Sequence, residues 1–248
     1  MPHPPSVDSG PRFIKAIGSR RRNRVVDALF APWTPRVHPL LLALGFGCAL
    51  VVAGLVLLVR AKPYLPFDDD VLKAIQSINF GPLAAAFPFF SWVGGPGGGI
   101  YMQAASILIV LLLNRRAWLL ALAAVAGGAW YPLLVGVANR PRPLIGQVLR
   151  ITEHPGSTSF PSGHVIFITL SLGMVMLCVG HRHLPKRAIP IGWTVVAAIV
   201  LLAAISRVSA GVHWPLDVLA SILIAGGWLA LVTSFKWISD RALDKDAP

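Results

Sequence analysis

Charged residues are scarce in this sequence. Only 13% of its 248 residues are charged, whereas 55% are hydrophobic; a soluble domain carries about 25% charged residues. Several uncharged apolar runs reach about 20 residues, the length that a helix needs to cross a bilayer. The scarcity of charge therefore excludes an ordinary soluble domain and indicates an integral membrane protein.

Cysteine is rare as well, and acidic residues form only one dense group. The two cysteines, Cys48 and Cys178, lie inside apolar runs and form no C-x-x-C pair, so they predict no disulfide framework. Three adjacent aspartates at 68–70 could hold a divalent metal. Because no second acidic cluster accompanies them, the start of a helix is the favoured interpretation. We expect no metal and no cofactor.

Positive charge is in excess, with a formal net charge of +12. A nucleic-acid-binding protein gathers its basic residues on one exposed surface, whereas here they are spread between apolar runs. The densest group, within residues 20–24, is expected to contact anionic lipid headgroups. We therefore expect membrane lipids and no nucleic acid as partners, and the sequence carries no indication of oligomeric state.

The chain divides into three parts. Residues 1–36 are expected to form a basic, largely disordered cytoplasmic arm, residues 37–238 a six-span membrane domain, and residues 239–248 a cytoplasmic tail. The predicted spans are Val37–Val59, a span that begins near Pro96, Ala117–Ala138, Val165–Gly180, Ala188–Ser206 and Pro215–Phe235. Continuous apolar runs of this length disfavour a barrel. The expected fold class is all-α, an integral membrane bundle of six transmembrane helices.

Two segments between the spans have patterns of their own. Apolar residues at helical spacing follow the aspartates at 68–70 and predict a short amphipathic helix on the membrane surface. The glycine-rich run 94–99 lacks the Lys and the Ser or Thr of a P-loop. It is interpreted as a loop before the second span rather than as a phosphate cradle.

The distribution of positive charge orients the chain. Six spans place both termini on one side, and 15 of the 22 lysines and arginines fall on that side. By the positive-inside rule the termini are predicted to be cytoplasmic, in a multi-pass protein of the cell membrane, either inner or plasma membrane. Two polar segments, 139–164 and 206–217, then lie on the outer or periplasmic face, where clustered ionisable residues indicate function.

The second polar segment holds a histidine and an aspartate at helical spacing. His213 and Asp217 are four residues apart, so they share one face of the helix that opens the sixth span. The aspartate can accept a hydrogen bond from one imidazole nitrogen and leave the other free to attack a substrate. Alone, such a pair is more often a structural hydrogen bond.

Further residues make a phosphate site the better interpretation. Arg207 and Arg142 offer guanidinium groups that match phosphate oxygens, whereas Arg150 and Arg60 are interpreted as surface charges near lipid headgroups. Three residues precede the fourth span, where unpaired backbone N–H groups favour an anion: Ser162, Gly163 and His164. In this position Gly163 would let the backbone approach a phosphate, and His164 could protonate a departing oxygen.

These residues carry a family resemblance. Arg142-Pro143, Pro-Ser-Gly-His at 161–164 and Ser206-Arg207-x5-His213-x3-Asp217 resemble the three-part signature of the phosphatidic acid phosphatase type 2 family. The second and third parts match fully, and the resemblance extends over about residues 40–235. The chain is similar to the bacterial membrane lipid phosphatases of this family, including undecaprenyl-diphosphate phosphatases.

The resemblance implies a metal-independent reaction on a lipid phosphomonoester or diphosphate at the outer face. His213 would take the phosphoryl group as a phosphohistidine, Asp217 would orient it, and His164 would protonate the leaving group. Water would then hydrolyse the intermediate. The expected phosphate-binding residues are Arg142, Arg207, Ser162 and Gly163, which would stabilise the charge of the transition state.

One position departs from the family pattern. The first part of the signature is Lys-x6-Arg-Pro, and counting back from Arg142 reaches Val135 instead of lysine. The site therefore lacks one positive charge unless Arg140 turns inward and binds phosphate in its place. Without that replacement, the pocket would prefer a less charged phosphate, act slowly or be inactive.

Two kinds of substrate fit this prediction, polyprenyl diphosphates and glycerophospholipid phosphates. The alternative function is a lipid-phosphate-binding membrane protein of the same fold that is non-catalytic or of altered specificity. The intact His213, Asp217 and His164 argue against that alternative, and Val135 argues mildly for it.

Overall fold

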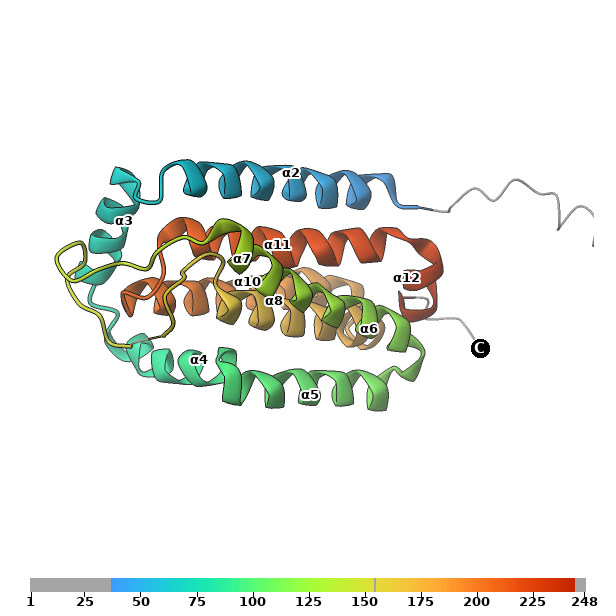
Figure 1. The fold of residues 1–248 in the computed structure, drawn as a ribbon. Coiled ribbons are helices and arrows are strands. Elements are labelled where there is room, and N and C mark those ends of the chain that lie inside the picture. Colours follow the sequence, from blue (N-terminus) through green and yellow to red (C-terminus); the bar gives the residue numbers. More distant parts are fainter. Residues whose placement is uncertain (1–36, 154, 244–248) are drawn as a thin grey trace, which may run out of the picture. The chain divides into compact units, whose positions relative to one another are not determined.

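The structure is a computed structural model, and it describes residues 37–153 and 155–243. The predicted arm 1–36, residues 244–248 of the predicted tail and the loop residue His154 lie outside the described residues. Figure 1 gives the order of the helices in the described part.

In the described part of the chain, six helical segments are long and apolar enough to cross a membrane: α2 (Pro39–Ala61), α5 (Pro96–Leu113), Arg115–Ala138, Gly163–His183, Lys186–Ser209 and Pro215–Ser234. They confirm the predicted spans to within a few residues at each end. Within residues 37–153 and 155–243 there is no β-strand, only isolated bridges. The expected fold class, an all-α membrane bundle, is confirmed.

Three of these spans are composed of several shorter elements. The third contains η2 (Arg115–Ala117), α6 (Trp118–Ala126), η3 (Gly127–Ala129) and α7 (Trp130–Ala138), and the fourth contains α8 (Gly163–Val175), the π-helical turn η4 (Met176–Gly180) and α9 (His181–His183). The fifth contains η5 (Lys186–Ala188) and α10 (Ile189–Ser209), and the sixth is α11 (Pro215–Ser234).

The fourth and sixth spans form the centre of the bundle. Their apolar windows are 72% and 67% buried, against 17–22% for the other four. Helix α2 packs closely on α11, because Gly45 and Gly227 lack side chains at the contact: a Cβ on Gly227 would lie 2.5 Å from Cys48 Cβ. Such small-residue contacts are a general way of packing helices in membranes.

Two helices that do not span the bundle lie at its opposite ends (Figure 1). Helix α3 (Pro66–Ser77) lies at the end that also carries the loop 139–162, and α12 (Lys236–Leu243) lies at the other. The predicted domain boundary at residue 238 falls inside α12. Buried Asn114 donates hydrogen bonds to Cys178 O at 2.6 Å and to Ala242 O at 2.9 Å, which ties α12 to the bundle.

The predicted amphipathic helix corresponds to α3, but its buried face is more polar than expected. Asp68, Leu72 and Gln76 lie at four-residue intervals and are 0%, 0% and 2% exposed. Proline at the first position and acidic residues in the first turn favour the start of this helix. Because two of its three buried residues are polar, α3 makes specific hydrogen bonds to the end of the bundle that carries the loop 139–162, hereafter the site end.

The glycine-rich run is helical rather than a loop. Helix α4 (Phe87–Gly94), which follows the 3-10 turn η1 (Gly81–Ala86), ends there and α5 begins at Pro96. A Cβ on Gly94 would lie 2.8 Å from His164 Cβ, and a Cβ on Gly98 would lie 2.2 Å from Trp92 O. These glycines are therefore required by close packing between α4, α5 and α8.

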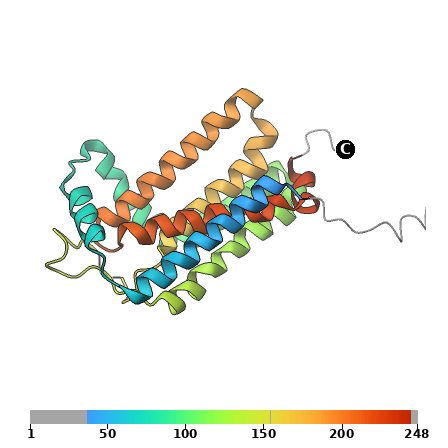
Figure 2. The ribbon, with the colours of Figure 1, turned by 90° about the horizontal axis from the view of Figure 1, so that it is seen from above.

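Helix α10 reaches the site end at an angle. Figure 2 shows it inclined to α2 and α11, with its C-terminal end near α3 and α4. Contacts between α10 and both of these helices agree with that view. The site end is thus enclosed by α3, α4, α8, α10, α11 and the loop 139–162.

Candidate active site

His213 lies in the short turn between α10 and α11 and is 3% exposed. Its Nδ1 is 2.7 Å from Ser159 O. A carbonyl oxygen only accepts, so Nδ1 carries the hydrogen and the neutral ring leaves an unprotonated Nε2. Nε2 lies 3.4 Å from a terminal nitrogen of Arg142. An anion bound by that guanidinium would therefore lie next to Nε2.

The residue that fixes His213 therefore differs from the predicted one. Asp217 Oδ2 is 3.7 Å from His213 Nδ1, longer than the contact to Ser159 O. Asp217 Oδ2 instead accepts from the backbone N–H of Trp214 at 2.9 Å and caps α11. Asp217 remains an electrostatic neighbour of His213, but the hydrogen bond that selects the tautomer is donated by Nδ1 to the backbone carbonyl of Ser159.

Arg140 turns inward, but to carboxylates. Its terminal nitrogens lie 2.8 Å from Asp217 Oδ1 and 2.5 Å from Asp68 Oδ2, and all three side chains are 0% exposed. Its Nε donates to Pro63 O at 2.9 Å, and its Cζ lies 5.3 Å from the centre of the Trp214 ring. The sequence raised the possibility that Arg140 binds phosphate; in the structure its side chain instead joins α3 to the start of α11.

The loop that carries Arg140 and Arg142 begins at a helix end with a defined geometry. Asn139 adopts a left-handed conformation with φ of 45°, and its N–H bonds to Val135 O at 3.1 Å to close α7. Trp214 Nε1 donates to Pro141 O at 2.9 Å. This bond joins the loop to the residue that follows His213.

Arg142 is the arginine beside His213. It donates from Nε to Gly156 O and from a terminal nitrogen to Val212 O, so backbone carbonyls hold the side chain in place. Among residues 37–153 and 155–243 it has no ion-pair partner. Burial lowers the pKa of Arg142 from its ordinary value. This guanidinium is the positive group that remains available to a phosphate next to Nε2.

Arg207 forms a second cluster near the end of α10. It is 1% exposed, pairs with Glu153 Oε2 at 2.9 Å and donates to the hydroxyl of Ser91. Ser91 in turn donates to Glu153 Oε1 at 2.6 Å. Burial raises the pKa of Glu153, but the hydrogen bond from Ser91 and the charge of Arg207 outweigh it, so the pKa lies below its usual value.

The segment before α8 borders both clusters. His164 Nε2 is 3.2 Å from Ser91 O, which places it beside Arg207. The backbone N–H of Ser162 donates to Ser221 Oγ at 2.8 Å. Ser162 Oγ is buried and has no hydrogen-bond partner in the described part of the chain, which is unusual for a buried hydroxyl unless a ligand completes it.

Gly163 has a packing requirement that the sequence did not reveal. A Cβ at this position would lie 2.9 Å from the ring of Tyr131. The missing side chain lets α7 and α8 approach each other at the site, in addition to any approach of the backbone to a ligand.

The structure therefore brings together the predicted site residues at one end of the bundle. His213, Arg142, Asp217 and Arg140 form one connected group, and Arg207 and His164 meet through Ser91. Five contributors were not among the residues predicted from the sequence: Asp68, Ser91, Glu153, Ser159 and Trp214. Only Asp68 left a signal in the sequence, as one of three adjacent aspartates.

This arrangement is that of a membrane-embedded helical bundle with imidazole and guanidinium groups gathered at one end. A comparison with protein families matches residues 116–241, just over half of the chain, to the PAP2 superfamily. The chain belongs to the PAP2 superfamily, as the sequence predicted.

Two characterised relatives and one solved structure are similar to the chain. Phosphatidylglycerophosphatase B of Haemophilus influenzae is 35% identical over 95 residues, which are 37% of each protein. Undecaprenyl-diphosphatase of Sulfolobus acidocaldarius is 24% identical over 191 residues, 74% of this chain and 85% of that protein. Both names are those of phosphatases, the class of enzyme that the sequence predicted.

The solved structure supports the fold. A transmembrane PAP2-type phosphatidylglycerolphosphate phosphatase from Bacillus subtilis superimposes with a TM-score of 0.63 at 19% identity, covering 83% of this chain and 100% of that one. At this identity the likeness concerns the architecture of the helices.

Proposed function

We propose that the chain is a lipid phosphatase in which His213 Nε2 attacks the phosphorus of a lipid phosphate. The observation that carries the proposal is the fixed imidazole: Nδ1 lies 2.7 Å from Ser159 O, and Nε2 lies 3.4 Å from Arg142. A nucleophile needs a free lone pair directed at a bound electrophile. The substrates in the names of the two relatives, phosphatidylglycerophosphate and undecaprenyl diphosphate, indicate the class of lipid.

The reaction has two steps. In the first, a bond forms between Nε2 of His213 and phosphorus, the bond from phosphorus to the leaving oxygen breaks, and protonated His164 donates its proton to that oxygen. In the second, water attacks phosphorus, the N–P bond breaks, and neutral His164 takes the proton of the water. Arg142 stabilises the charge on the phosphoryl oxygens in both steps. No step in this scheme needs a metal ion.

A neutral His213 is required for the first step. Burial lowers the pKa of His213 below its ordinary value of 6.5, and the charge of Arg142 adds to this effect, although Asp217 opposes it. The ring therefore stays unprotonated at neutral pH, when its lone pair is available.

The arrangement of charge supports a site on the outer face of the membrane. The basic segments at 115–116, 182–187 and 236–241 gather around α12, since α12 contacts both η2 and α9, and His213 lies with α3 at the opposite end. The positive-inside rule then assigns the α12 end to the cytoplasm and the site to the outer face of the cell membrane. Modification of a cysteine introduced at exposed Asn79 by a membrane-impermeant maleimide on intact cells tests this orientation.

Phosphate release from detergent-solubilised lipid phosphates tests the activity. We expect release by the wild type in the presence of EDTA and a loss of about 10³-fold or more in His213→Asn, which removes the nucleophile. Activity that persists in His213→Asn would show that another group attacks. Activity abolished by EDTA and restored by a divalent ion would exclude the metal-free route. Binding of lipid phosphates without release by the wild type would favour the non-catalytic alternative.

A further inference from the structure

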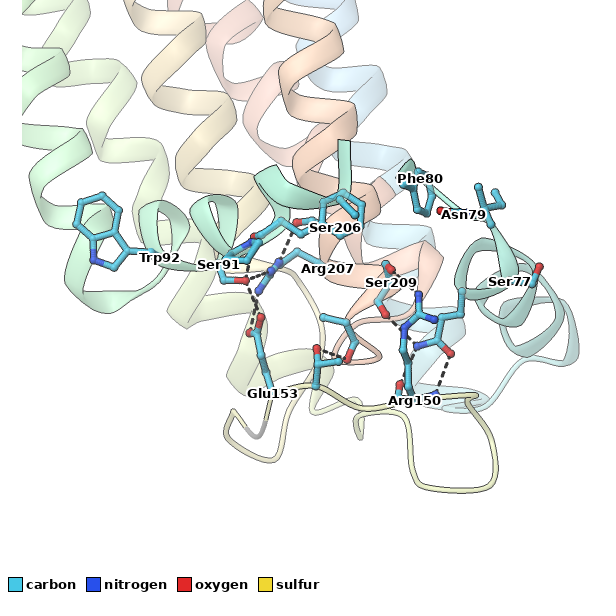
Figure 3. A pocket seen from close by; sticks show the side chains of 17 residues that line it. Ser77, Asn79, Phe80, Ser91, Trp92, Arg150, Glu153, Ser206, Arg207 and Ser209 are labelled. Atoms are coloured by element: carbon cyan, nitrogen blue, oxygen red, sulfur yellow. Dashed lines mark hydrogen bonds and ion pairs between the residues drawn. The ribbon is translucent and has the colours of Figure 1, made fainter. Parts of the chain in front are cut away.

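A large cavity adjoins Arg207 at the site end of the bundle (Figure 3). Its volume is about 980 Å³, and it lies between α3, η1, α4, the end of α10 and the loop residues 150–153. One part of its wall is apolar, with Phe80, Phe87 and Trp92, and another is polar. Pockets for small ligands commonly measure about 300–1,000 Å³, so a lipid headgroup fits.

Two arginines line this cavity, and their surroundings differ. Arg207 is paired with Glu153 and bonded to Ser91. Arg150 donates to Ser209 Oγ at 3.1 Å, and no carboxylate lies within ion-pairing distance of it in residues 37–153 and 155–243. Arginine has five N–H donors, so Arg150 retains donors for a ligand. Figure 3 shows the two arginines on separate parts of the same wall.

The backbone of Arg150 is held in place by the buried side chain of Gln76. Gln76 Oε1 accepts from the N–H groups of Leu149 at 2.8 Å and Arg150 at 3.4 Å. Gln76 Nε2 donates to Arg150 O at 2.7 Å and to Ser209 O at 3.1 Å. One amide that is 2% exposed therefore bonds the loop and α10 together at the point where Arg150 emerges.

The residues that follow α10 pack closely against the backbone of the segment 150–152. Gly211 has φ of +73°, and a Cβ there would lie 2.1 Å from Arg150 O. Thr152 N also donates to Ala210 O at 3.0 Å. The sequence suggested that Arg150 is a surface charge near lipid headgroups. Such a residue would not require these backbone contacts to Gln76, Ala210 and Gly211. Because the backbone of Arg150 is already fixed, less conformational entropy is lost when this residue binds a ligand.

We propose that Arg150 binds a second phosphate of the lipid substrate, the one that is not cleaved. The inference rests on the proposed function, because it assigns the scissile phosphate to the His213 and Arg142 end of the site. Arg150 then selects lipids that carry two phosphates. Either the phosphates are joined directly, as in a polyprenyl diphosphate, or a short headgroup separates them, as in phosphatidylglycerol phosphate. The planar fork of arginine matches two phosphate oxygens.

Selectivity between lipids tests this role. KM and kcat are measured for phosphatidic acid, which has one phosphate, and for a polyprenyl diphosphate and phosphatidylglycerol phosphate. The readout is the ratio of kcat/KM for each two-phosphate lipid to that for phosphatidic acid. In Arg150→Gln we expect this ratio to fall about 10-fold or more, mainly through KM, since a charge-assisted hydrogen bond is lost.

Two further variants serve as controls. Arg150→Lys keeps the charge and is expected to lose less of the ratio than Arg150→Gln. Lys62→Gln removes an exposed cation at the same end of the bundle but outside the cavity, and it should leave the ratio unchanged. A loss confined to the diphosphate identifies adjacent phosphates as the ligand. A loss confined to phosphatidylglycerol phosphate identifies separated ones.

Several results would overturn the inference. An unchanged ratio in Arg150→Gln, or an equal fall in kcat/KM for all three lipids, would remove Arg150 from recognition of the second phosphate. Direct binding of the three lipids to His213→Asn protein, with and without Arg150→Gln, gives the same comparison without turnover. Wild type that releases no phosphate would contradict the proposed function, and the binding comparison would still decide the role of Arg150.

Discussion

Asp68→Asn tests whether the ion-paired cluster at the start of α11 positions His213. The amide preserves the shape of the side chain and removes its charge. Asp68 Oδ2 lies 2.5 Å from Arg140, and Asp68 Oδ1 accepts from the N–H of Leu216 at 3.2 Å. Leu216 stands three residues after His213 in the first turn of α11. The variant therefore disturbs the turn that carries His213 from α3, without touching the proposed phosphate-binding side chain of Arg142.

The structure suggests the size of the effect. Removing one partner of a buried ion pair costs about 3–5 kcal/mol when the other charge is left alone. Here Arg140 keeps Asp217. Burial also raises the pKa of Asp68 above its ordinary value despite Arg140, so the folded protein disfavours its charge. We expect the free energy of unfolding to fall by about 1–3 kcal/mol.

The expected effect on catalysis is larger than the effect on binding. Because a displacement of about 1 Å in a reacting group can cost about 100-fold in rate, we expect kcat to fall about 10- to 100-fold. KM should change by less than about threefold, since Arg142 and its carbonyl partners are intact.

The assay combines lipid phosphate hydrolysis with thermal unfolding in the same detergent. Asp70→Asn is the matched control, because Asp70 is exposed in the same helix and its loss changes the net charge equally. The reasoning is refuted if Asp68→Asn has the kcat of Asp70→Asn. It is also refuted if the loss of activity only follows the fraction of unfolded protein.

Three further outcomes follow from the site. Glu153→Gln removes the charge that pairs with Arg207, so we expect KM for lipid phosphates to fall severalfold in steady-state assays; a higher KM would mean that the pair supports binding. Gly211→Ala forces a Cβ to 2.1 Å from Arg150 O at φ of +73°, so we expect a loss of about 2 kcal/mol or more in unfolding measurements, and an unchanged melting temperature would contradict this contact. Because the pKa of His213 lies below 6.5, protonation removes the nucleophile only in more acidic solution. The acid limb of kcat/KM due to His213 should therefore lie below pH 6.5, and a limb above that value would count against a buried nucleophile.

The spans were predictable because their signals are local. Proline at the first or second helical position and an uncharged run of the right length mark the starts of α2, α5 and α11. The predicted functional residues also lie at one end of the bundle. They follow the third and fifth spans, and the segments after two odd-numbered spans lie on the same side of the membrane. What the spacing could not specify is which partner each side chain selects.

The partners depend on packing between distant segments. His213 and Asp217 share a helix face, yet the shorter bond of His213 is to Ser159 O, 54 residues away. Arg140 was considered for phosphate, but α3 supplies Asp68 from 72 residues away. The glycine run was interpreted as a loop from its composition. The structure explains Gly94 by its close packing against His164, a residue 70 positions later in the sequence, and this contact cannot be recognised from the sequence alone.

The most direct test of the proposed nucleophile is to trap the covalent intermediate. Wild type is mixed for milliseconds with a lipid substrate labelled with ³²P in the scissile phosphate, quenched in alkali, and digested for mass spectrometry. We predict acid-labile, alkali-stable label on the peptide that contains His213, with none in His213→Asn and a normal amount in Asp70→Asn. Label on another residue, or turnover with inversion at phosphorus in a chiral phosphate, would contradict a phosphohistidine at His213.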